Sequence, residues 1–422
     1  MITGLERISQ LANEHPDRKL QTLMHLVNTR TLKEVHDRQD KNKAYGVDNV
    51  TKSEYEEELE KNLAGLVAKM KQYSYRPQPV RRTYIPKEGS NDKMRPLGIP
   101  AYEDKLVQGA MADIMTAIYE PKFYSFSYGF RANRDCHKAL SALKSELWNG
   151  TNWVVDADIK GFFDNVDHEW LMKFLEHDIA DKNLLRYVTR FLKAGIMEEG
   201  KYFDTDSGVP QGGLISPVLA NIYLHYTIDT WFAKVIKPRS KGKAAMVRYA
   251  DDIVFCFERE EEAREFYQAL RVRLAKLKLE LSEEKSKIIK FGISAGDDTG
   301  KFDFLGFTHL IGRSREGKPC VKRITSQKKL KAKRQKVKQW LWENMHTPVN
   351  LLVEKLNRKL QGHYNYYGII GNFDAMAGFR EYVLDRLKAV LGRRGSGYIT
   401  HEKFKRILQY NPVVKPRIVH RV

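Results

Sequence analysis

Two neighbouring carboxylates, Asp251 and Asp252, separate two short, largely apolar runs at residues 247–249 and 253–255. Apolar runs on both sides of a short polar break are typical of a buried β-hairpin, so we expect the acids at its tip. Unneutralised carboxylates there would repel each other and would be costly to remove from water. A cation is therefore the expected partner, and oxygen ligands suit Mg²⁺, which binds through few carboxylates. Taken alone, an Asp-Asp pair is also typical of solvated loops and helix caps.

A second acidic segment lies upstream, where the apolar residues 153–155 lead to Asp156, Asp158 and then to aromatic residues. This pattern predicts a strand that ends beside the hairpin. If Asp158 meets Asp251 across adjacent strands, the two can share a pair of metal ions roughly 4 Å apart, the arrangement used in nucleotidyl transfer. Asp156 lies on the same strand face, so a shift of register could exchange it with Asp158. Either acidic segment alone is more simply a strand end with polar caps.

A third segment, residues 207–223, is a glycine-rich turn that opens an apolar helix with Pro217 near its first turn. Glycine lets the backbone approach a ligand closely, and proline is favoured at the start of a helix. Gln211 would project a neutral amide toward a base pair or a sugar. The glycine content alone is equally typical of an ordinary helix start.

In this order, the three segments resemble the palm of reverse transcriptases, and their residues are most similar to those of the group II intron-encoded enzymes known as maturases. Asn49 stands where that family usually has a glycine, and Asn tolerates a positive φ. The Cys/His-rich endonuclease domain of some members has no counterpart here, so we expect a bacterial type without it. Further stretches resemble family blocks in the family's order: residues 44–51, 82–87 with 94–100, 127–134, 279–286 and 302–307.

The resemblance implies that Asp158, Asp251 and Asp252 are the catalytic acids and that they bind two Mg²⁺ ions. Phe163 would lie under the sugar of the incoming nucleotide, where its ring would exclude a 2′-hydroxyl and select deoxynucleotides. Gln211 would contact the same nucleotide. A ring at position 163 is also what an ordinary hydrophobic core would contain.

The resemblance also assigns basic residues to the nucleotide. Lys87 and Arg95 would clamp the triphosphate, because a flexible ammonium and a forked guanidinium suit phosphate oxygens. Lys285 would lie near the leaving pyrophosphate as a proton donor, although Lys287 is close by. The resemblance gives primer or template contacts to Tyr249, Leu305 and Gly306.

The charge of the chain indicates a nucleic-acid partner. The formal net charge is +20 and the estimated pI is 9.5, while 42% of the residues are hydrophobic. A sizeable core therefore coexists with a strongly cationic surface. Between residues 313 and 338 many lysines and arginines face a single acid, Glu316, which is typical of a segment lying along phosphates or of a solvated basic helix. The candidate RNA-binding residues there are Lys328, Lys329, Lys331, Lys333 and Arg334.

Two amphipathic helices are predicted from hydrophobic spacing. One covers residues 260–279, with its apolar face formed by Ala263, Phe266, Leu270 and Leu274. The other underlies the basic run, with its apolar face formed by Leu330, Val337 and Leu341.

Cysteine use and the absence of long apolar runs favour a bacterial cytoplasmic protein. Cys136, Cys256 and Cys320 are far apart and form no CxxC pair, so neither a disulfide framework nor a zinc site is expected. Residues 1–10 lack the apolar core of a signal peptide, and no apolar run approaches the ~20 residues of a membrane span. We therefore expect neither secretion nor membrane insertion.

The predicted fold is α+β: a right-hand polymerase whose fingers and palm contain an antiparallel sheet with the Asp-Asp hairpin, followed by an α-helical thumb. We expect an N-terminal helical extension at residues 1–40 and the fingers and palm at 41–310. The thumb, or maturase domain, is expected at 311–391, and a short basic C-terminal tail at 392–422.

The predicted function is RNA-directed DNA polymerisation of the group II intron type, with Mg²⁺ as cofactor. The expected partners are an RNA template, a DNA primer, deoxynucleoside triphosphates and group II intron RNA, whose splicing and mobility the protein would assist. Two alternatives stay open. One is a domesticated reverse transcriptase of phage defence or DNA repair, and the other is a protein that acts mainly as an RNA-binding splicing factor.

Overall fold

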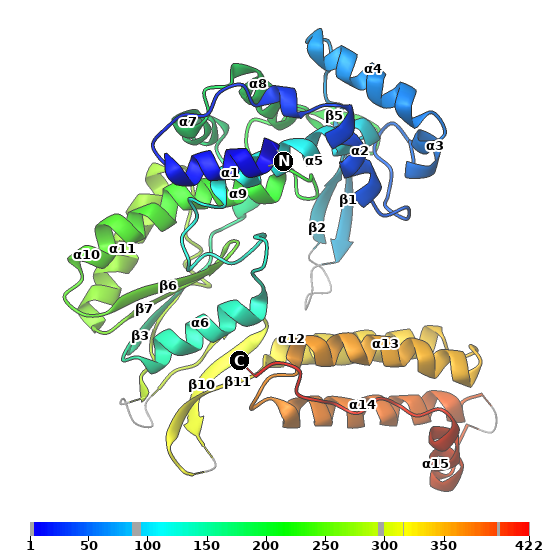
Figure 1. Cartoon of the computed structure of the whole chain (residues 1–422). Coiled ribbons are helices and arrows are strands. Elements are labelled where there is room, and N and C mark those ends of the chain that lie inside the picture. The colour runs from blue at the N-terminus through cyan, green and yellow to red at the C-terminus, as the bar shows by residue number, and fades with distance from the viewer. Residues whose placement is uncertain (1–3, 87–93, 294–298, 315, 395–396, 422) are drawn as a thin grey trace. The chain divides into compact units, whose positions relative to one another are not determined.

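The computed structural model describes residues 4–86, 94–293, 299–314, 316–394 and 397–421 (Figure 1). These residues divide into two compact units. The first holds residues 4–86, 94–135 and 155–288, and the second holds residues 136–154 and 289–421, apart from the gaps just given. Within the described ranges, no helix is both long and apolar enough to cross a membrane.

The first unit mixes helices with short strands. Its helices are α1 (Gly4–Glu14), η1 (Met24–Leu26), α2 (Thr29–Arg38), α3 (Lys52–Glu56), α4 (Leu59–Lys71), α5 (Tyr102–Tyr119), η2 (Phe162–Asp164), α7 (His168–Asp178), α8 (Lys182–Leu192), α9 (Ser216–Leu224), η3 (His225–Asp229), η4 (Phe232–Ile236), α10 (Lys237–Arg239) and α11 (Glu260–Lys276). Its strands are β1 (Val80–Pro86), β2 (Met94–Ile99), β4 (Ile196–Glu198), β5 (Lys201–Phe203), β6 (Ala244–Tyr249) and β7 (Asp252–Phe257). Two further strands, β3 (Trp153–Ala157) and β8 (Lys287–Lys290), belong to it only in part, through residues 155–157 and 287–288.

The strands of this unit form separate sheets. One has the order β2-β1-β4-β5, in which β1 pairs antiparallel with β2 and parallel with β4. The other has the order β6-β7-β3-β8 and holds both acidic segments of the sequence. The fold is therefore α+β, as predicted. Lys87, predicted to clamp the triphosphate, and residues 88–93, between the family blocks at 82–87 and 94–100, lie outside the described residues.

Helix α11 covers one face of the acid-bearing sheet, and its buried residues are the four predicted from the spacing: Ala263, Phe266, Leu270 and Leu274. The Phe266 ring lies 4.5 Å from the ring of Phe255 and 5.0 Å from that of Phe257, measured between centroids. All three rings are buried. Strand β7, whose first residue is Asp252, lies between β6 and β3 in the sheet, and this aromatic packing adds to its stability.

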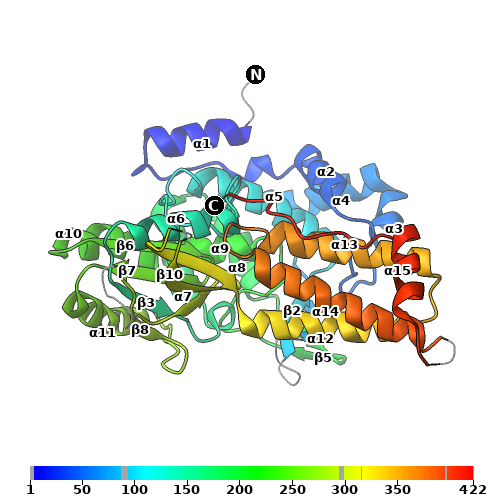
Figure 2. The same cartoon turned by 90° about the horizontal axis from the view of Figure 1, so that it is seen from below.

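The second unit joins a small sheet to a helical bundle. Its strands, in the sheet order β11-β10-β9, are β9 (Phe302–Phe304), β10 (Phe307–Arg313) and β11 (Pro319–Thr325). Its helices are α6 (Cys136–Trp148), α12 (Gln327–Glu343), α13 (Val349–Tyr367), α14 (Phe373–Gly392) and α15 (His401–Tyr410). Helices α12, α13 and α14 run alongside one another, as Figure 2 shows from below.

The bundle of α12, α13 and α14 is held by a continuous apolar core. Helix α12 contributes Leu330, Val337 and Leu341, the apolar face predicted for the basic run, and Phe379 of α14 is buried among the same residues. The last residues of the chain return along α13, where the backbone N–H of Val419 donates to the Gly368 carbonyl at 2.7 Å. This end of the chain is therefore packed on the bundle.

Candidate active site

The acidic turn joins β6 and β7. These strands pair antiparallel with Tyr249 opposite Asp252, so that Ala250 and Asp251 form the turn between them. Ala250 has a φ of +54°, in the left-handed region that a residue with a side chain adopts at a cost of about 1 kcal/mol or more. The surrounding structure must therefore hold this turn in place.

A glycine packs directly against the turn. A Cβ atom on Gly129 would lie 2.4 Å from the backbone nitrogen of Ala250, closer than any side chain can come. The strand-like segment that carries this glycine runs beside β6, where the Tyr128 N–H donates to the Arg248 carbonyl at 2.8 Å and the Arg248 N–H donates to the Phe126 carbonyl at 2.9 Å. The block at residues 127–134 thus forms the support behind the acids.

A buried arginine, Arg248, is hydrogen-bonded to the turn between β6 and β7. Arg248 is fully buried, and its Nε and Nη2 donate to the two carboxylate oxygens of Asp229 at 2.8 and 2.5 Å. Its Nη1 donates to the Asn221 side-chain oxygen at 2.9 Å and to the Ala250 carbonyl at 3.1 Å. Its Nη2 also reaches the Ser127 hydroxyl at 2.8 Å. Every N–H of the guanidinium therefore has an acceptor, which a buried charge requires.

Asn221 ties this arginine to the glycine. Its side-chain N–H₂ donates to the Gly129 carbonyl at 2.8 Å, while its oxygen accepts from Arg248. Asn221 comes from α9, the helix that follows the glycine-rich turn. Neither Asn221 nor Arg248 was predicted to have a role. Arg248 is a charged residue inside an otherwise apolar strand run, and such a residue indicates a buried partner.

Asp158 follows β3 and is fixed by its own backbone. Its N–H donates to the Ser286 hydroxyl at 3.1 Å, and its carbonyl accepts from the Ser282 N–H at 2.8 Å. Its carboxylate pairs with the Lys285 ammonium at 2.9 Å. The segment at residues 282–286, which includes Lys285, therefore positions Asp158.

The Asp251 carboxyl is affected by its burial and by nearby charges. Burial raises the pKa of Asp251 above its usual range, and the negative charge of Asp158 raises it further, while Arg95 and Arg248 act in the opposite direction. Arg95, on β2, is also close enough for its charge to reach Asp251.

Asp158 and Asp251 present an oxygen-only donor set, which is the chemistry that Mg²⁺ prefers. The repulsion within the pair would be relieved by a cation, and the Lys285 ammonium already occupies such a position on Asp158. Asp252 is exposed at the start of β7. Over the described ranges, no three His, Cys, Asp or Glu side chains stand close enough together to hold a metal ion by themselves. The residues fit an ion that keeps waters or substrate oxygens in its shell.

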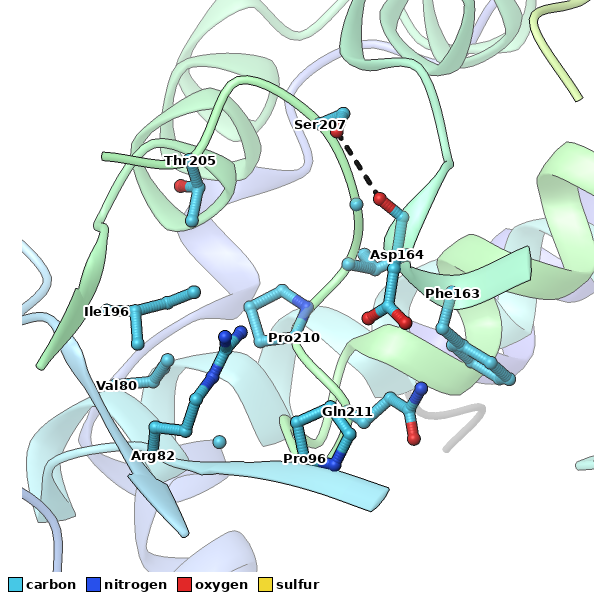
Figure 3. A pocket seen from close by; sticks show the side chains of 13 residues that line it. Val80, Arg82, Pro96, Phe163, Asp164, Ile196, Thr205, Ser207, Pro210 and Gln211 are labelled. Atoms are coloured by element: carbon cyan, nitrogen blue, oxygen red, sulfur yellow. Dashed lines mark hydrogen bonds between the residues drawn. The ribbon is translucent and has the colours of Figure 1, made fainter. Parts of the chain in front are cut away.

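A cavity of about 260 Å³ in the first unit brings together two further predicted residues, Phe163 and Gln211 (Figure 3). Phe163 belongs to η2, and Gln211 lies in the glycine-rich turn. That turn is wedged against β2, because a Cβ atom on Gly212, whose φ is +113°, would lie 2.5 Å from the Gly98 carbonyl oxygen. The glycines therefore allow close backbone packing that lines a cavity.

Two charged side chains line the same cavity without having been predicted. The guanidinium of Arg82 points into it, and the carboxylate of Asp164 lies between Phe163 and Gln211 in Figure 3. The Arg82 Nε is buried and, among the described residues, has no hydrogen-bond partner. Arg82 belongs to the family block at residues 82–87, for which only Lys87 was predicted to contact the nucleotide.

The remaining predicted residues belong to the second unit. Leu305 and Gly306 form the turn between β9 and β10, and the Tyr366 hydroxyl donates to the Leu305 carbonyl at 2.8 Å. On α12, Lys328 and Lys331 are exposed, whereas Lys329, Lys333 and Arg334 are partly buried.

Residues 85–309 match the family model described as reverse transcriptase (RNA-dependent DNA polymerase). The chain belongs to the reverse transcriptase family. It has the right-hand polymerase fold of that family. It is similar to the group II intron-encoded protein LtrA of Lactococcus lactis subsp. cremoris, at 32% identity over 75% of this chain. It is also similar to protein YkfC of Escherichia coli K12, at 35% identity over 67% of this chain and 80% of YkfC. A third relative is the 91 kDa protein in cob intron of Schizosaccharomyces pombe, at 38% identity over 38% of this chain and 20% of that protein.

The chain spans 65% of the length of LtrA. The predicted resemblance to group II intron-encoded reverse transcriptases is confirmed by these relatives. The acidic segments, the glycine-rich turn and the buried Arg248 all lie within the residues that match the family model.

The buried ion pair beneath the turn gives a stability prediction. Arg248→Met should lower the free energy of unfolding by about 3–5 kcal/mol, because it leaves the buried Asp229 carboxylate without its partner. The double variant Arg248→Met with Asp229→Leu should recover most of that loss. Urea denaturation followed by circular dichroism measures both.

The matched control is Arg264→Met, which removes an exposed i,i+4 pair with Glu260 and should cost less than about 1 kcal/mol. A double variant as unstable as Arg248→Met would mean that packing around Arg248, and not its charge, holds the turn.

Proposed function

We propose that this protein is an RNA-directed DNA polymerase that adds deoxynucleotides to a primer 3′-hydroxyl on an RNA template. The observation that carries the proposal is the supported turn between β6 and β7, which holds Asp251 and Asp252 in the same sheet as β3, the strand that leads to Asp158, in a chain of the reverse transcriptase family. Residues 41–310 would form the fingers and palm, 311–391 an α-helical thumb and 392–422 a basic tail. Residues 1–40 would be the N-terminal extension.

Asp158, Asp251 and Asp252 are the residues proposed to hold Mg²⁺. Two bound ions would supply Lewis acidity at the primer hydroxyl and at the leaving oxygen. Lys285 would hold a proton near the pyrophosphate, and the contact of its ammonium with Asp158 at 2.9 Å supports this role.

The cavity at Phe163 and Gln211 is the proposed nucleotide pocket. The Phe163 ring would exclude the 2′-hydroxyl, and the Gln211 amide would contact the nucleotide without adding charge. Arg95, Lys87 and Arg82 would bind the triphosphate, and the unpartnered Nε of Arg82 supports its place among them. Primer or template contacts are assigned to Tyr249, Leu305 and Gly306.

Asp251→Asn should abolish primer extension and leave RNA affinity nearly unchanged, because it removes a metal ligand and no phosphate contact. Primer extension on an RNA template and fluorescence anisotropy with the same RNA measure the two effects. Glu265→Gln, an exposed acid on α11, is the control and should change neither. Retained polymerisation in Asp251→Asn would refute the assignment of this acid.

The same substitution should stabilise the fold. A carboxyl whose pKa is raised on folding binds its proton more tightly in the folded state, so stability falls as pH rises through the interval between the two pKa values. Above that interval, Asp251→Asn should therefore melt at a higher temperature than the unmodified protein in the absence of metal. Added Mg²⁺ should raise the melting temperature of the unmodified protein more than that of the variant.

Phe163→Val should admit ribonucleotides more readily. The smaller side chain opens space beneath the sugar, and fitting or excluding one small group in a pocket typically alters discrimination by about 10- to 200-fold. Single-nucleotide insertion with dATP and ATP measures the ratio of kcat/KM. An unchanged ratio would place the sugar selectivity elsewhere.

A second proposed role is the binding of group II intron RNA to assist splicing and mobility. The net charge of +20 and the cations of α12 support it, with Lys328, Lys329, Lys331, Lys333 and Arg334 as proposed contacts. The name of LtrA describes an intron-encoded protein, which favours this partner over others.

Sequencing the RNA that co-purifies with the Asp251→Asn protein from its host tests this role. We expect one intron surrounding the gene for this protein. An unrelated noncoding RNA or mixed transcripts would refute the intron role and favour defence or repair.

A further inference from the structure

The second unit contains a cavity of about 340 Å³ between α12 and α14. Its lining includes Gln335, Lys338 and Trp342 from α12, Arg386 from α14, and Arg393 just after α14. These helices lie next to each other in both views (Figures 1 and 2). The volume is at the lower end of the range for small-molecule sites, ~300–1,000 Å³.

One wall of the cavity is a flat aromatic surface. Trp342 is 50% exposed, although tryptophan has a large apolar side chain. The guanidinium of Arg393 lies over its ring, 4.6 Å from the ring centroid. Indole rings and guanidinium groups are both surfaces on which proteins stack unpaired bases.

The other walls are cationic and have unused donors. Lys338, Arg386 and Arg393 line the cavity, and no carboxylate is among its described lining residues. The Nε of Arg386 is buried and, within the described part of the chain, has no hydrogen-bond partner. The Arg386 guanidinium lies over the Tyr382 ring, 5.5 Å from its centroid. The cavity is thus suited to an anionic ligand with hydrogen-bond acceptors.

A track of exposed side chains along α12 leads into this cavity. Successive steps of three and four residues place them on one helix face. The face extends over about 21 Å, at 1.5 Å per residue. Its members, all exposed, are Lys328, Lys331, Gln335, Lys338 and Trp342. A polyanion that follows the lysines would arrive at the Trp342 ring.

We propose that the cavity binds one unpaired base of a single-stranded nucleic acid, stacked on Trp342, while the phosphates of that strand follow the lysines of α12. This site rests on the proposed nucleic-acid function and names a specific contact within it. An acidic peptide would satisfy the charge but not the flat aromatic wall. The strand can be RNA or DNA, since both carry the same bases and phosphates.

The test uses the full-length protein and two fluorescent eight-nucleotide strands. One is abasic throughout, and the other is identical except for a single adenine. The unmodified protein should bind the adenine strand about tenfold more tightly, because stacking of one base typically contributes that much or more. Ribose and deoxyribose versions of both strands distinguish an RNA from a DNA source.

Trp342→Ala should remove the preference for adenine and leave the affinity for the abasic strand unchanged, while Trp342→Phe should retain part of the preference. Lys338→Gln and Arg386→Gln should each lower the affinity of the protein for both strands. Trp148→Ala, an exposed tryptophan of α6, and Lys355→Gln, an exposed cation of α13, are the matched controls and should change neither value.

A preference for adenine that survives Trp342→Ala would overturn the proposal, as would equal binding of the two strands by the unmodified protein. Competition by a polyglutamate peptide as effective as by the adenine strand would assign the cavity to a protein partner. Primer extension on a pre-annealed template measures the polymerase separately. If the unmodified protein extends no primer, the proposed polymerase function is refuted, whereas the measured preference for adenine is unaffected.

Discussion

The buried ion pair between Arg248 and Asp229 is the interaction on which the candidate active site depends. A guanidinium withdrawn from water requires an acceptor for every N–H, and those acceptors come from segments far apart in the chain. One of them is the Ala250 carbonyl, inside the strained turn. The need to satisfy one buried charge therefore fixes the block at residues 127–129, helix α9 and the acidic turn relative to one another.

This support is needed because the site itself opposes folding. Asp158 and Asp251 repel each other, and burial disfavours the charge on Asp251. Ala250 adds backbone strain in the same turn. A surface loop would relax by moving the acids apart, whereas a turn anchored to a buried arginine and covered by Gly129 cannot. Sites that bring like charges together commonly lose stability in this way, and the loss is recovered in the surrounding structure.

Features of the fold that depend on periodicity could be predicted from the sequence. The buried faces of α11 and α12 follow hydrophobic spacing, and the two acidic segments lie in the same sheet. The surroundings of Arg248, Arg82 and Trp342 could not be predicted in this way. Each depends on which residues from distant segments surround it, and a local pattern carries no information on those neighbours.

The basic run shows the same limit within one helix. The five cations predicted to bind RNA differ in their surroundings. Lys328 and Lys331 are exposed, whereas the Arg334 guanidinium lies 5.3 Å from the Tyr382 ring centroid. Helix α12 also begins with cations and has no acid in its first turn. Positive charge at a helix N-terminus opposes the helix dipole, so the apolar face must hold this helix in the free protein. Phosphates along its exposed face would remove that opposition, which couples the stability of α12 to the binding of a polyanion.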